Sequence, residues 1–333
     1  MRERLFLLGR KPTTATSAPA EPPEPSIPDW QACDPREISQ ALGRALARPS
    51  GGWVVLDATR AIQKGPRKYV VNGRELVAWW CKKPGHEGTR VGPDHCPHMG
   101  AELSKGSVDR EGRIVCPWHG WALSGETPKG TFRPLVTFDD GVLSWVRVPE
   151  LVSHGEALTD RPYLPERPRR FLDATIRVEA RCEPRDVIAN RLDPWHGAHF
   201  HPHSFANLRI VDRGLDHITA RVVYRIASGV GMEVDARFDS PEPRTIVMTI
   251  VAGEGIGSIV ETHATPISDG RTAIIEATLA TSERGSVISW LPAAGRLLRP
   301  LVEARAKKLW LDDAEYCERT YSLRREKAGR QDP

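Results

Sequence analysis

The sequence predicts an α+β protein: a small antiparallel β domain, then a larger domain of strands that ends in a long helix. Two turn signals flanked by β-rich runs, Asn72-Gly73 and Asp140-Gly141, predict hairpins in the first half. Five runs between residues 171 and 282, several of them alternating, predict a sheet buried on one face. From about Leu291 to Lys327 the pattern is helical, with few breakers.

Composition limits the classes of protein that this chain can belong to. Its 333 residues are enough for two domains, and its hydrophobic and charged contents, 40% and 27%, are typical of folded domains. A net charge of +4 without an uninterrupted Lys/Arg block argues weakly against nucleic-acid binding. No apolar run approaches the roughly 18 residues that span a bilayer. The apolar stretch at residues 5–9 is shorter than the roughly 7–15 residues of a secretory signal.

The six cysteines indicate a reducing compartment. They are too few and too scattered for a disulfide framework, so we expect a cytoplasmic protein with free thiols. Their positions are 33, 81, 96, 116, 182 and 317.

The chain divides into three predicted parts. Residues 1–28 form a flexible N-terminal tether, because residues 10–28 are rich in Pro, Ala, Thr and Ser. Residues 29–155 form the small β domain with a leading helix, in which Asp34 is the N-cap, Pro35 lies in the first turn and Gly51-Gly52 marks the end. Residues 156–333 form the second domain.

A first group of metal ligands lies in the small domain. Cys96-x-His98 is followed, after 17 residues, by Cys116-x-x-His119. Structural zinc sites pair like ligands at short spacing, whereas here each loop supplies one Cys and one His. This arrangement favours a cluster of two unlike irons, one held by two thiolates and the other by two imidazoles, over a zinc ribbon. Both loops also carry residues that bend the backbone so that N–H groups can face the sulfides: Pro97, Gly100, Pro117 and Gly120.

The paired motifs "CPH" and "CPWHG" resemble the Rieske 2Fe-2S domain over about residues 50–148. The resemblance implies that Cys96 and Cys116 hold one iron and that His98 and His119 hold the other. Respiratory-chain Rieske proteins carry an additional cysteine in each loop. Here those positions are Met99 and Trp118, so the sequence resembles the oxygenase and ferredoxin branch.

A second group of candidate ligands lies in "NRLDPWHGAHFHPHSF". It fits Asn-x-x-Asp-x-x-His-x(4)-His through Asn190, Asp193, His196 and His201. This pattern resembles the mononuclear iron motif of the Rieske non-heme iron oxygenases, closest to the vanillate O-demethylase and chlorophyll-pathway branch. For residues 156–333 the resemblance implies a helix-grip fold, a curved antiparallel sheet with a long C-terminal helix. Such sites hold Fe(II) with two histidines and one carboxylate.

The choice of histidines depends on where a helix ends. On an uninterrupted helix His199 would share a face with His196 and would be the better partner. Pro202, however, disfavours helical geometry at His201, so the helix should loosen there and let His201 reach the metal. We therefore expect His196 and His201 as ligands, with His199 as the alternative and His203 as a solvated or substrate-lining residue.

The third ligand of the mononuclear site is expected in "KKLWLDDAEYCERT". By resemblance, an Asp followed five residues later by a Glu supplies it, and Asp313 with Glu318 has this spacing. Asp312 is the alternative ligand.

Asp193 is expected to act without binding the metal. By resemblance, it connects a cluster histidine of one subunit to the iron histidine of its neighbour through hydrogen bonds, within a head-to-tail homotrimer. A ligating imidazole commonly donates its second N–H to such an acceptor. The alternative is a charge at a helix N-terminus beside Pro194.

The predicted activity follows from both groups. We expect an oxygenase that uses O2 to hydroxylate, demethylate or otherwise oxidise an apolar substrate, aromatic, terpenoid or steroid-like, at a mononuclear Fe(II). Gly253-x-Gly255-x-Gly257 lacks a following helix and is a weak nucleotide-site match, so electrons should come from a separate ferredoxin or flavin reductase. The alternative is a Rieske electron-transfer protein with a non-catalytic binding domain.

Residues 288–310 could rest on a membrane surface, although packing against the sheet is the favoured interpretation.

Overall fold

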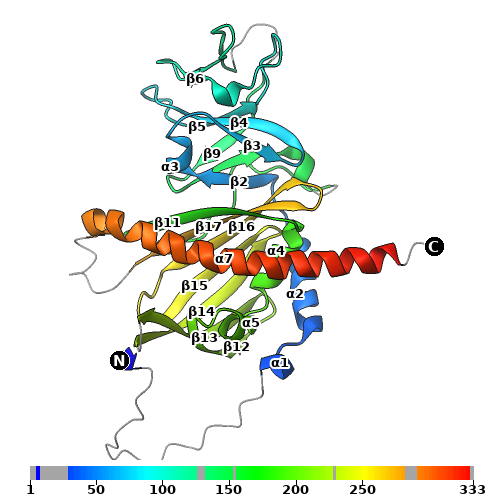
Figure 1. Ribbon diagram of the computed structural model, residues 1–333, viewed down its shortest axis with the longest axis vertical. Helices are drawn as coiled ribbons and strands as arrows, with labels where there is room; N and C mark the ends of the chain where they lie inside the picture. Colours follow the sequence, from blue (N-terminus) through cyan, green and yellow to red (C-terminus); the bar gives the residue numbers. More distant parts are fainter. Residues whose placement is uncertain are drawn as a thin grey trace, which may run out of the picture.

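The computed structural model describes residues 5–7, 29–125, 132–152, 155–227, 230–281 and 291–330. A small β domain lies at one end of the molecule, and a large sheet crossed by one long helix forms the rest (Figure 1). Most of the expected tether, residues 1–28, lies outside the described residues. Within it, β1 (Leu5–Leu7) pairs antiparallel with β14 (Val230–Glu242) of the large sheet.

A helical segment precedes the small domain, as expected. It consists of α1 (Asp29–Ala32) and α2 (Pro35–Leu46). Asp34 caps α2, because its carboxylate accepts a 2.8 Å hydrogen bond from the backbone N–H of Arg36. The predicted end at Gly51-Gly52 was wrong: α2 ends at Leu46, ahead of Pro49. Both glycines instead form the turn into β2, with φ of +60° and +80°.

In its described residues, the small domain contains three antiparallel sheets of three strands each, in the orders β2-β10-β9, β3-β4-β5 and β6-β7-β8. Both predicted hairpins are present. Asn72 and Gly73 have positive φ, 48° and 76°, and connect β3 to β4, while Gly141, with φ 84°, lies between β9 and β10. The elements are β2 (Trp53–Ala58), α3 (Thr59–Ile62), β3 (Arg67–Val71), β4 (Arg74–Cys81), β5 (Gly88–Pro93), β6 (Ser107–Val108), β7 (Ile114–Val115), β8 (Ala122–Leu123), β9 (Thr137–Asp139) and β10 (Leu143–Arg147), with two short 3₁₀ turns at Leu103–Lys105 and Pro149–Leu151.

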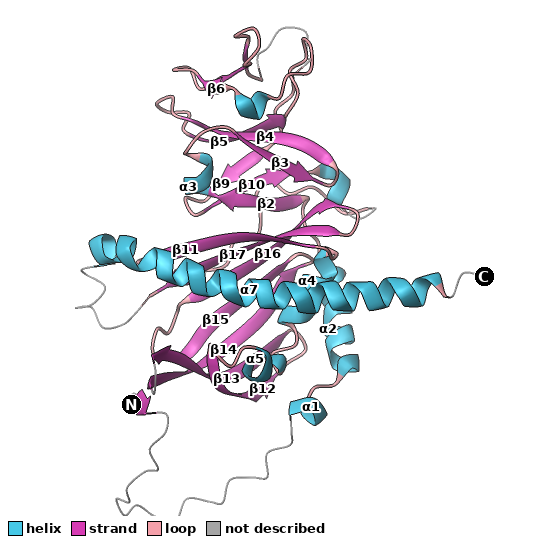
Figure 2. Cartoon of the chain, in the orientation of Figure 1, coloured by secondary structure: helices cyan, strands magenta, loops and turns pink. Residues whose placement is uncertain are grey.

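The large sheet has the order β11-β17-β16-β15-β14-β13-β12, with all pairings antiparallel. The five expected strands are present, and β12 and β14 are two further strands that were not expected. The fold class is confirmed: antiparallel sheets in both halves and a C-terminal helix, α7 (Leu291–Gly329), that crosses the face of the large sheet (Figure 2). The remaining elements are β11 (Leu172–Ala180), α4 (Pro184–Arg191), α5 (His196–Phe200), β12 (Phe205–Arg213), β13 (His217–Ala227), β15 (Thr245–Gly253), β16 (Ile259–Ser268) and β17 (Arg271–Ala280).

The main core fixes α7 on the sheet. Trp310 and Cys317 of α7 are fully buried against Ile188 of α4 and Ile274 of β17. Burying such side chains contributes about 1.5–3 kcal/mol each. This packing holds the middle of α7 beside α4 and α5, where the candidate metal ligands lie.

A second core joins the two halves of the chain. Trp53 and Trp145 of the small domain pack against Ile275 and other apolar residues of β16 and β17. A buried ionic network lies beside it: the Arg167 guanidinium donates to Glu261 at 2.6 and 2.9 Å and to Asp140 at 3.0 Å. Arg167 lies between β10 and β11, and its side chain thereby connects the two halves.

Candidate functional site

The two cysteine–histidine loops of the small domain share one pattern of backbone hydrogen bonds. In the first loop, which follows β5, the N–H of Cys96 donates to the carbonyl of Ala101 and the N–H of Gly100 donates to the carbonyl of Cys96. The loop between β7 and β8 repeats both bonds, with Cys116 donating to Trp121 and Gly120 donating to Cys116. The two glycines have φ of 79° and 70°, the left-handed region that favours glycine.

The four candidate cluster ligands separate by depth. Cys96 and Cys116 are 3% and 2% exposed, whereas His98 and His119 lie on the surface with their ring centroids 4.9 Å apart. Backbone N–H groups point at both sulfurs: those of His98 and Met99 at Cys96, and those of His119 and Trp118 at Cys116. Two adjacent buried thiols, two surface imidazoles and N–H donors to sulfur fit a cluster with unlike irons.

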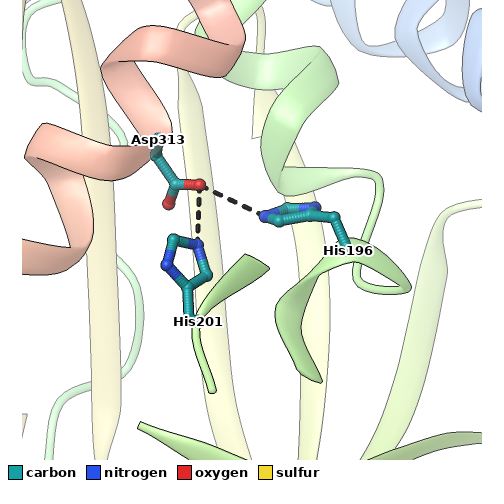
Figure 3. Close-up of side chains that lie close together, drawn as sticks. All are labelled: His196, His201 and Asp313. Carbon is teal, nitrogen blue, oxygen red and sulfur yellow. Dashed lines mark hydrogen bonds and ion pairs between the residues drawn. The ribbon is translucent and has the colours of Figure 1, made fainter. Parts of the chain in front are cut away.

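Three elements bring the second ligand group together. His196 is the first residue of α5, His201 directly follows its end, and Asp313 lies in the middle of α7. The Nε2 atoms of His196 and His201 lie 3.2 and 3.0 Å from the same oxygen, Oδ1 of Asp313 (Figure 3). Their potential ligand atoms all lie within 4.8 Å of one another. His201 and Asp313 are fully buried, at 2% and 1% exposure.

The end of α5 decides which histidine reaches this point. The helix stops at Phe200, and His201 leaves helical geometry with φ −118° and ψ 55°. Its ring therefore turns inward to Asp313. His199 remains on the outside, where its Nε2 lies 2.9 Å from Asp29 of α1.

Asp312 is next to Asp313 but faces the opposite side of His201. Its Oδ2 lies 3.6 Å from Nδ1 of His201 and 3.8 Å from Nε2 of His203. Asp312 thus lies behind the ring, whereas Asp313 lies in front of it. His203 lies at this outer edge and is exposed.

The charges and hydrogen bonds around His196, His201 and Asp313 favour the binding of a cation. Burial would raise the pKa of Asp313, but hydrogen bonds with His196 and His201 and the charge of Arg191 hold it well below its usual range. Burial would lower the pKa of His196, yet Asp193 and Asp313 together raise it to about 9. In the described part of the chain, Nδ1 of both histidines and Oδ1 of Asn190 are buried without a hydrogen-bond partner.

Asp193 lies behind His196, as Asp312 lies behind His201. Its Oδ2 is 3.7 Å from Nδ1 of His196 and accepts a 3.1 Å hydrogen bond from the hydroxyl of Tyr316. Its Oδ1 faces the thiol of Cys33 at 3.6 Å. The cluster loops lie at the opposite end of the same chain (Figure 1), far from α5.

Three residues of the site were not predicted from the sequence. Arg191 lies 4.0 Å from Oδ2 of Asp313, pairs with Glu276 and stacks on Trp310 at 4.4 Å from the ring centroid. Tyr316 stacks on His196 with a centroid distance of 5.3 Å. Trp310 and Tyr316 lie three residues before and after Asp313, the candidate ligand. Because residues three apart on a helix are neighbours, the predicted helix already indicated that both lie beside Asp313.

The fold and the two groups of candidate ligands point to a class of protein with a metal cluster in a small β domain and a second candidate metal site in a separate, larger domain. Family models match both parts: the Rieske [2Fe-2S] domain at residues 52–135, and a domain of unknown function, DUF5914, at residues 153–328. The second model covers more than half of the chain, so the chain belongs to the DUF5914 family and carries a Rieske [2Fe-2S] domain in its first half.

Relatives and solved structures agree with this placement. The chain is 38% identical over 63 residues to flavonoid 8-hydroxylase 2 of Ocimum basilicum, covering 19% of this chain and 12% of that protein. It is 34% identical over 91 residues to the oxygenase component of 3-ketosteroid-9-alpha-monooxygenase of Rhodococcus rhodochrous, covering 27% and 22%. These matches span at most about a fifth of the relatives' own lengths.

Two solved structures share the fold over most of the chain. Dicamba monooxygenase bound to dicamba has a TM-score of 0.56 at 16% identity, covering 85% of this chain and 91% of that one. The terminal oxygenase of carbazole 1,9a-dioxygenase from Novosphingobium sp. KA1 has a TM-score of 0.54 at 14% identity, covering 90% and 91%. Among the described residues, no helix is both long and apolar enough to cross a membrane.

Proposed function

We propose that this protein is the terminal oxygenase of a Rieske-type system, which uses O2 and electrons from a separate ferredoxin or flavin reductase to oxidise an apolar organic substrate. One observation carries the proposal. The chain combines a Cys2His2 group on paired loops with a separate group of two histidines and one carboxylate. A stand-alone electron carrier needs only the first of these.

In this proposal residues 29–155 form the cluster domain and residues 156–333 the catalytic domain. Cys96 and Cys116 would hold one iron of the 2Fe-2S cluster, and His98 and His119 the other. A mononuclear Fe(II) would be bound by Nε2 of His196 and His201 and by Asp313. When bound, the cluster supplies electrons and the mononuclear iron supplies dioxygen activation.

The protein's own residues would keep the mononuclear site in one geometry. Asn190 donates a 3.1 Å hydrogen bond to Oδ1 of Asp313, while Arg191 faces Oδ2. Asp193, the predicted catalytic bridge, would accept a hydrogen bond from the Nδ1–H group of His196. Asp313 and His196 would thus each have neighbours that fix their orientation before a metal binds.

The side chains beside His201 support an apolar substrate. The ring of Phe205 lies 6.1 Å from that of His201, and Tyr224 lies 5.1 Å beyond Phe205. The hydroxyl of Tyr224 contacts the sulfur of Met248 at 3.7 Å. The sheet around them is apolar, with Leu208, Ala220, Val222, Val234, Ala236 and Ile250 buried. We therefore propose an aromatic, terpenoid or steroid-like substrate.

A head-to-tail homotrimer would bring the two candidate metal sites together, because within one chain the cluster loops lie far from α5. Two groups of exposed apolar residues support it, one around the cluster loops and one near α5. The first consists of Met99, Trp118 and Trp121, at 63%, 60% and 37% exposure, and the second of Trp30, Phe200 and Leu215, at 76%, 40% and 78%. Docking the first group of one copy on the second group of the next would bring a cluster histidine to Asp193.

Two further predictions belong to this proposal. A cytoplasmic location is supported by the six cysteines, none of which forms a disulfide in the structure. Peripheral membrane contact stays a prediction. Leu297, Leu298 and Leu301 of α7 are exposed, and vesicle sedimentation would test whether they bind lipid.

Metal analysis of anaerobically purified protein tests the proposal. We expect about three irons per chain, two in the cluster and one mononuclear. With a surrogate reductase and a panel of apolar compounds, mass spectrometry should detect oxygenated products. His196→Ala should keep the visible cluster spectrum and abolish product formation. Two irons per chain and no product with any compound would favour an electron-transfer protein with a non-catalytic binding domain.

A further inference from the structure

Tyr316 contacts two parts of the candidate iron site at once. It lies one helical turn after Asp313 on α7, so both side chains leave the helix on the same face. Its ring stacks on the ring of His196, with a centroid distance of 5.3 Å and an interplanar angle of 29°. Its hydroxyl donates a 3.1 Å hydrogen bond to Oδ2 of Asp193.

Tyr316 donates its hydrogen bond to the oxygen of Asp193 that faces the ring of His196. Oδ2 of Asp193 is the atom that lies 3.7 Å from Nδ1 of His196. Within the described residues, Nδ1 of His196 is buried and has no hydrogen-bond partner, and this oxygen lies just beyond hydrogen-bond distance from it. The other oxygen, Oδ1, faces the thiol of Cys33 at 3.6 Å, which is a weak donor.

Without the Tyr316 hydroxyl, the carboxylate of Asp193 would be held less firmly, because the Cys33 thiol that faces its other oxygen is a weak donor. The terminal torsion of an aspartate is broad, so its orientation depends on its hydrogen-bond partners. Rotation would move the acceptor away from Nδ1 of His196, and the imidazole would lose the group that fixes its orientation.

We propose that Tyr316 is a positioning residue for electron entry, which holds Asp193 against His196 by bonding to one and stacking on the other. The inference rests on the proposed function, because it needs a metal at His196 and an electron that arrives through Asp193. It adds a residue that acts from α7, the same helix that supplies Asp313. One helix would thereby set both the metal ligand and the bridge.

Cobalt binding tests the role of Tyr316 without relying on turnover. Protein that retains its cluster and is stripped of mononuclear iron is titrated with Co(II), and the visible absorption of bound Co(II) is followed. The variants are Tyr316→Phe, Asp193→Ala and the double variant. Tyr321→Phe is the matched control, since Tyr321 lies on α7 five residues further on and packs in the main core.

We expect Tyr316→Phe to weaken Co(II) binding by about tenfold, the lower end of the effects seen when a residue that orients a metal ligand is changed. In the Asp193→Ala background the same change should have no further effect, because Tyr316 acts through Asp193. Tyr316→Phe should also slow oxidation of the reduced cluster in a single turnover of the iron-loaded protein.

The inference is overturned if Tyr316→Phe binds Co(II) and transfers electrons like Tyr321→Phe. It is also overturned if Tyr316→Phe weakens binding equally with and without Asp193, since the hydroxyl would then serve packing alone. If the unaltered protein binds no Co(II) at this site, the proposed function fails together with the inference. Normal Co(II) binding by the unaltered protein with an indifferent Tyr316→Phe removes only the inference.

Discussion

Oδ1 of Asp313 lies 3.0 Å from Nε2 of His201, although 112 residues separate the two along the chain. Both side chains are almost inaccessible to solvent. A buried carboxylate is costly unless it is paired, and here it is surrounded by imidazoles and an amide instead of apolar groups. This pair is therefore the part of the candidate site most sensitive to substitution.

His201→Ala should remove the mononuclear metal alone. We expect the iron content to fall from about three to about two per chain, with the visible cluster spectrum unchanged. The reason is that His201 lies in the large domain, at the opposite end of the molecule from Cys96 and Cys116. His199→Ala is the matched control, because His199 faces Asp29 on the surface. Loss of iron from His199→Ala, or full retention by His201→Ala, would contradict the ligand assignment.

Asp193→Asn should separate metal binding from electron transfer. Both metals should remain, but the single-turnover rate of cluster oxidation should fall by about 10–100-fold. The amide replaces a charged acceptor beside Nδ1 of His196 with a neutral one. Stopped-flow absorption of the cluster measures this rate, and Asp212→Asn, at an exposed carboxylate, is the control. An unchanged rate would remove the bridging role of Asp193.

Arg167→Met should strongly weaken the junction between the two halves. The substitution leaves the carboxylates of Glu261 and Asp140, whose side chains are 0% and 5% exposed, without their cationic partner. Breaking a buried pair in this way costs about 3–5 kcal/mol of the free energy of unfolding, as measured by urea denaturation. Arg271→Met is the control, because its pair with Glu179 is exposed and is worth at most about 1 kcal/mol. Equal effects of the two changes would show that the network contributes little.

The same network predicts an acid dependence of stability. Burial would raise the pKa values of Glu261 and Asp140, but hydrogen bonds with His263 and Arg167 lower the first, and Arg167 lowers the second. A carboxyl with a lowered pKa stabilises the folded state above its unfolded value, 4.5 for Glu and 3.8 for Asp, and this contribution is lost as the pH falls further.

We therefore expect the difference in unfolding free energy between the unaltered protein and Arg167→Met to shrink between pH 7 and pH 3. Urea titrations at both pH values measure it. A difference that stays constant or grows on acidification would show that these carboxyl groups do not stabilise the junction.

Local sequence patterns were sufficient for much of the fold. The Asn72-Gly73 turn, the Asp34 cap and the five expected strands all depend on neighbours within a few residues. β14 could also have been found, because Val234, Ala236 and Phe238 alternate with charged residues. The end of α2 was misplaced because Pro49, not the following glycines, was the nearer signal. The domain boundaries stay predictions.

The motif of each cluster loop and the spacing of His196 and His201 can be read from the sequence alone, because each lies on a short segment whose backbone geometry is local. Which side chains meet at a single point depended on how segments far apart in the chain pack together. This packing separated Asp313 from Asp312, which lie on opposite sides of His201, and it placed Arg191 and Tyr316 beside the site. The physical reason is that α7 packs across the sheet through Trp310 and Cys317, and this contact sets the rotation of α7 and therefore which residues face the histidines.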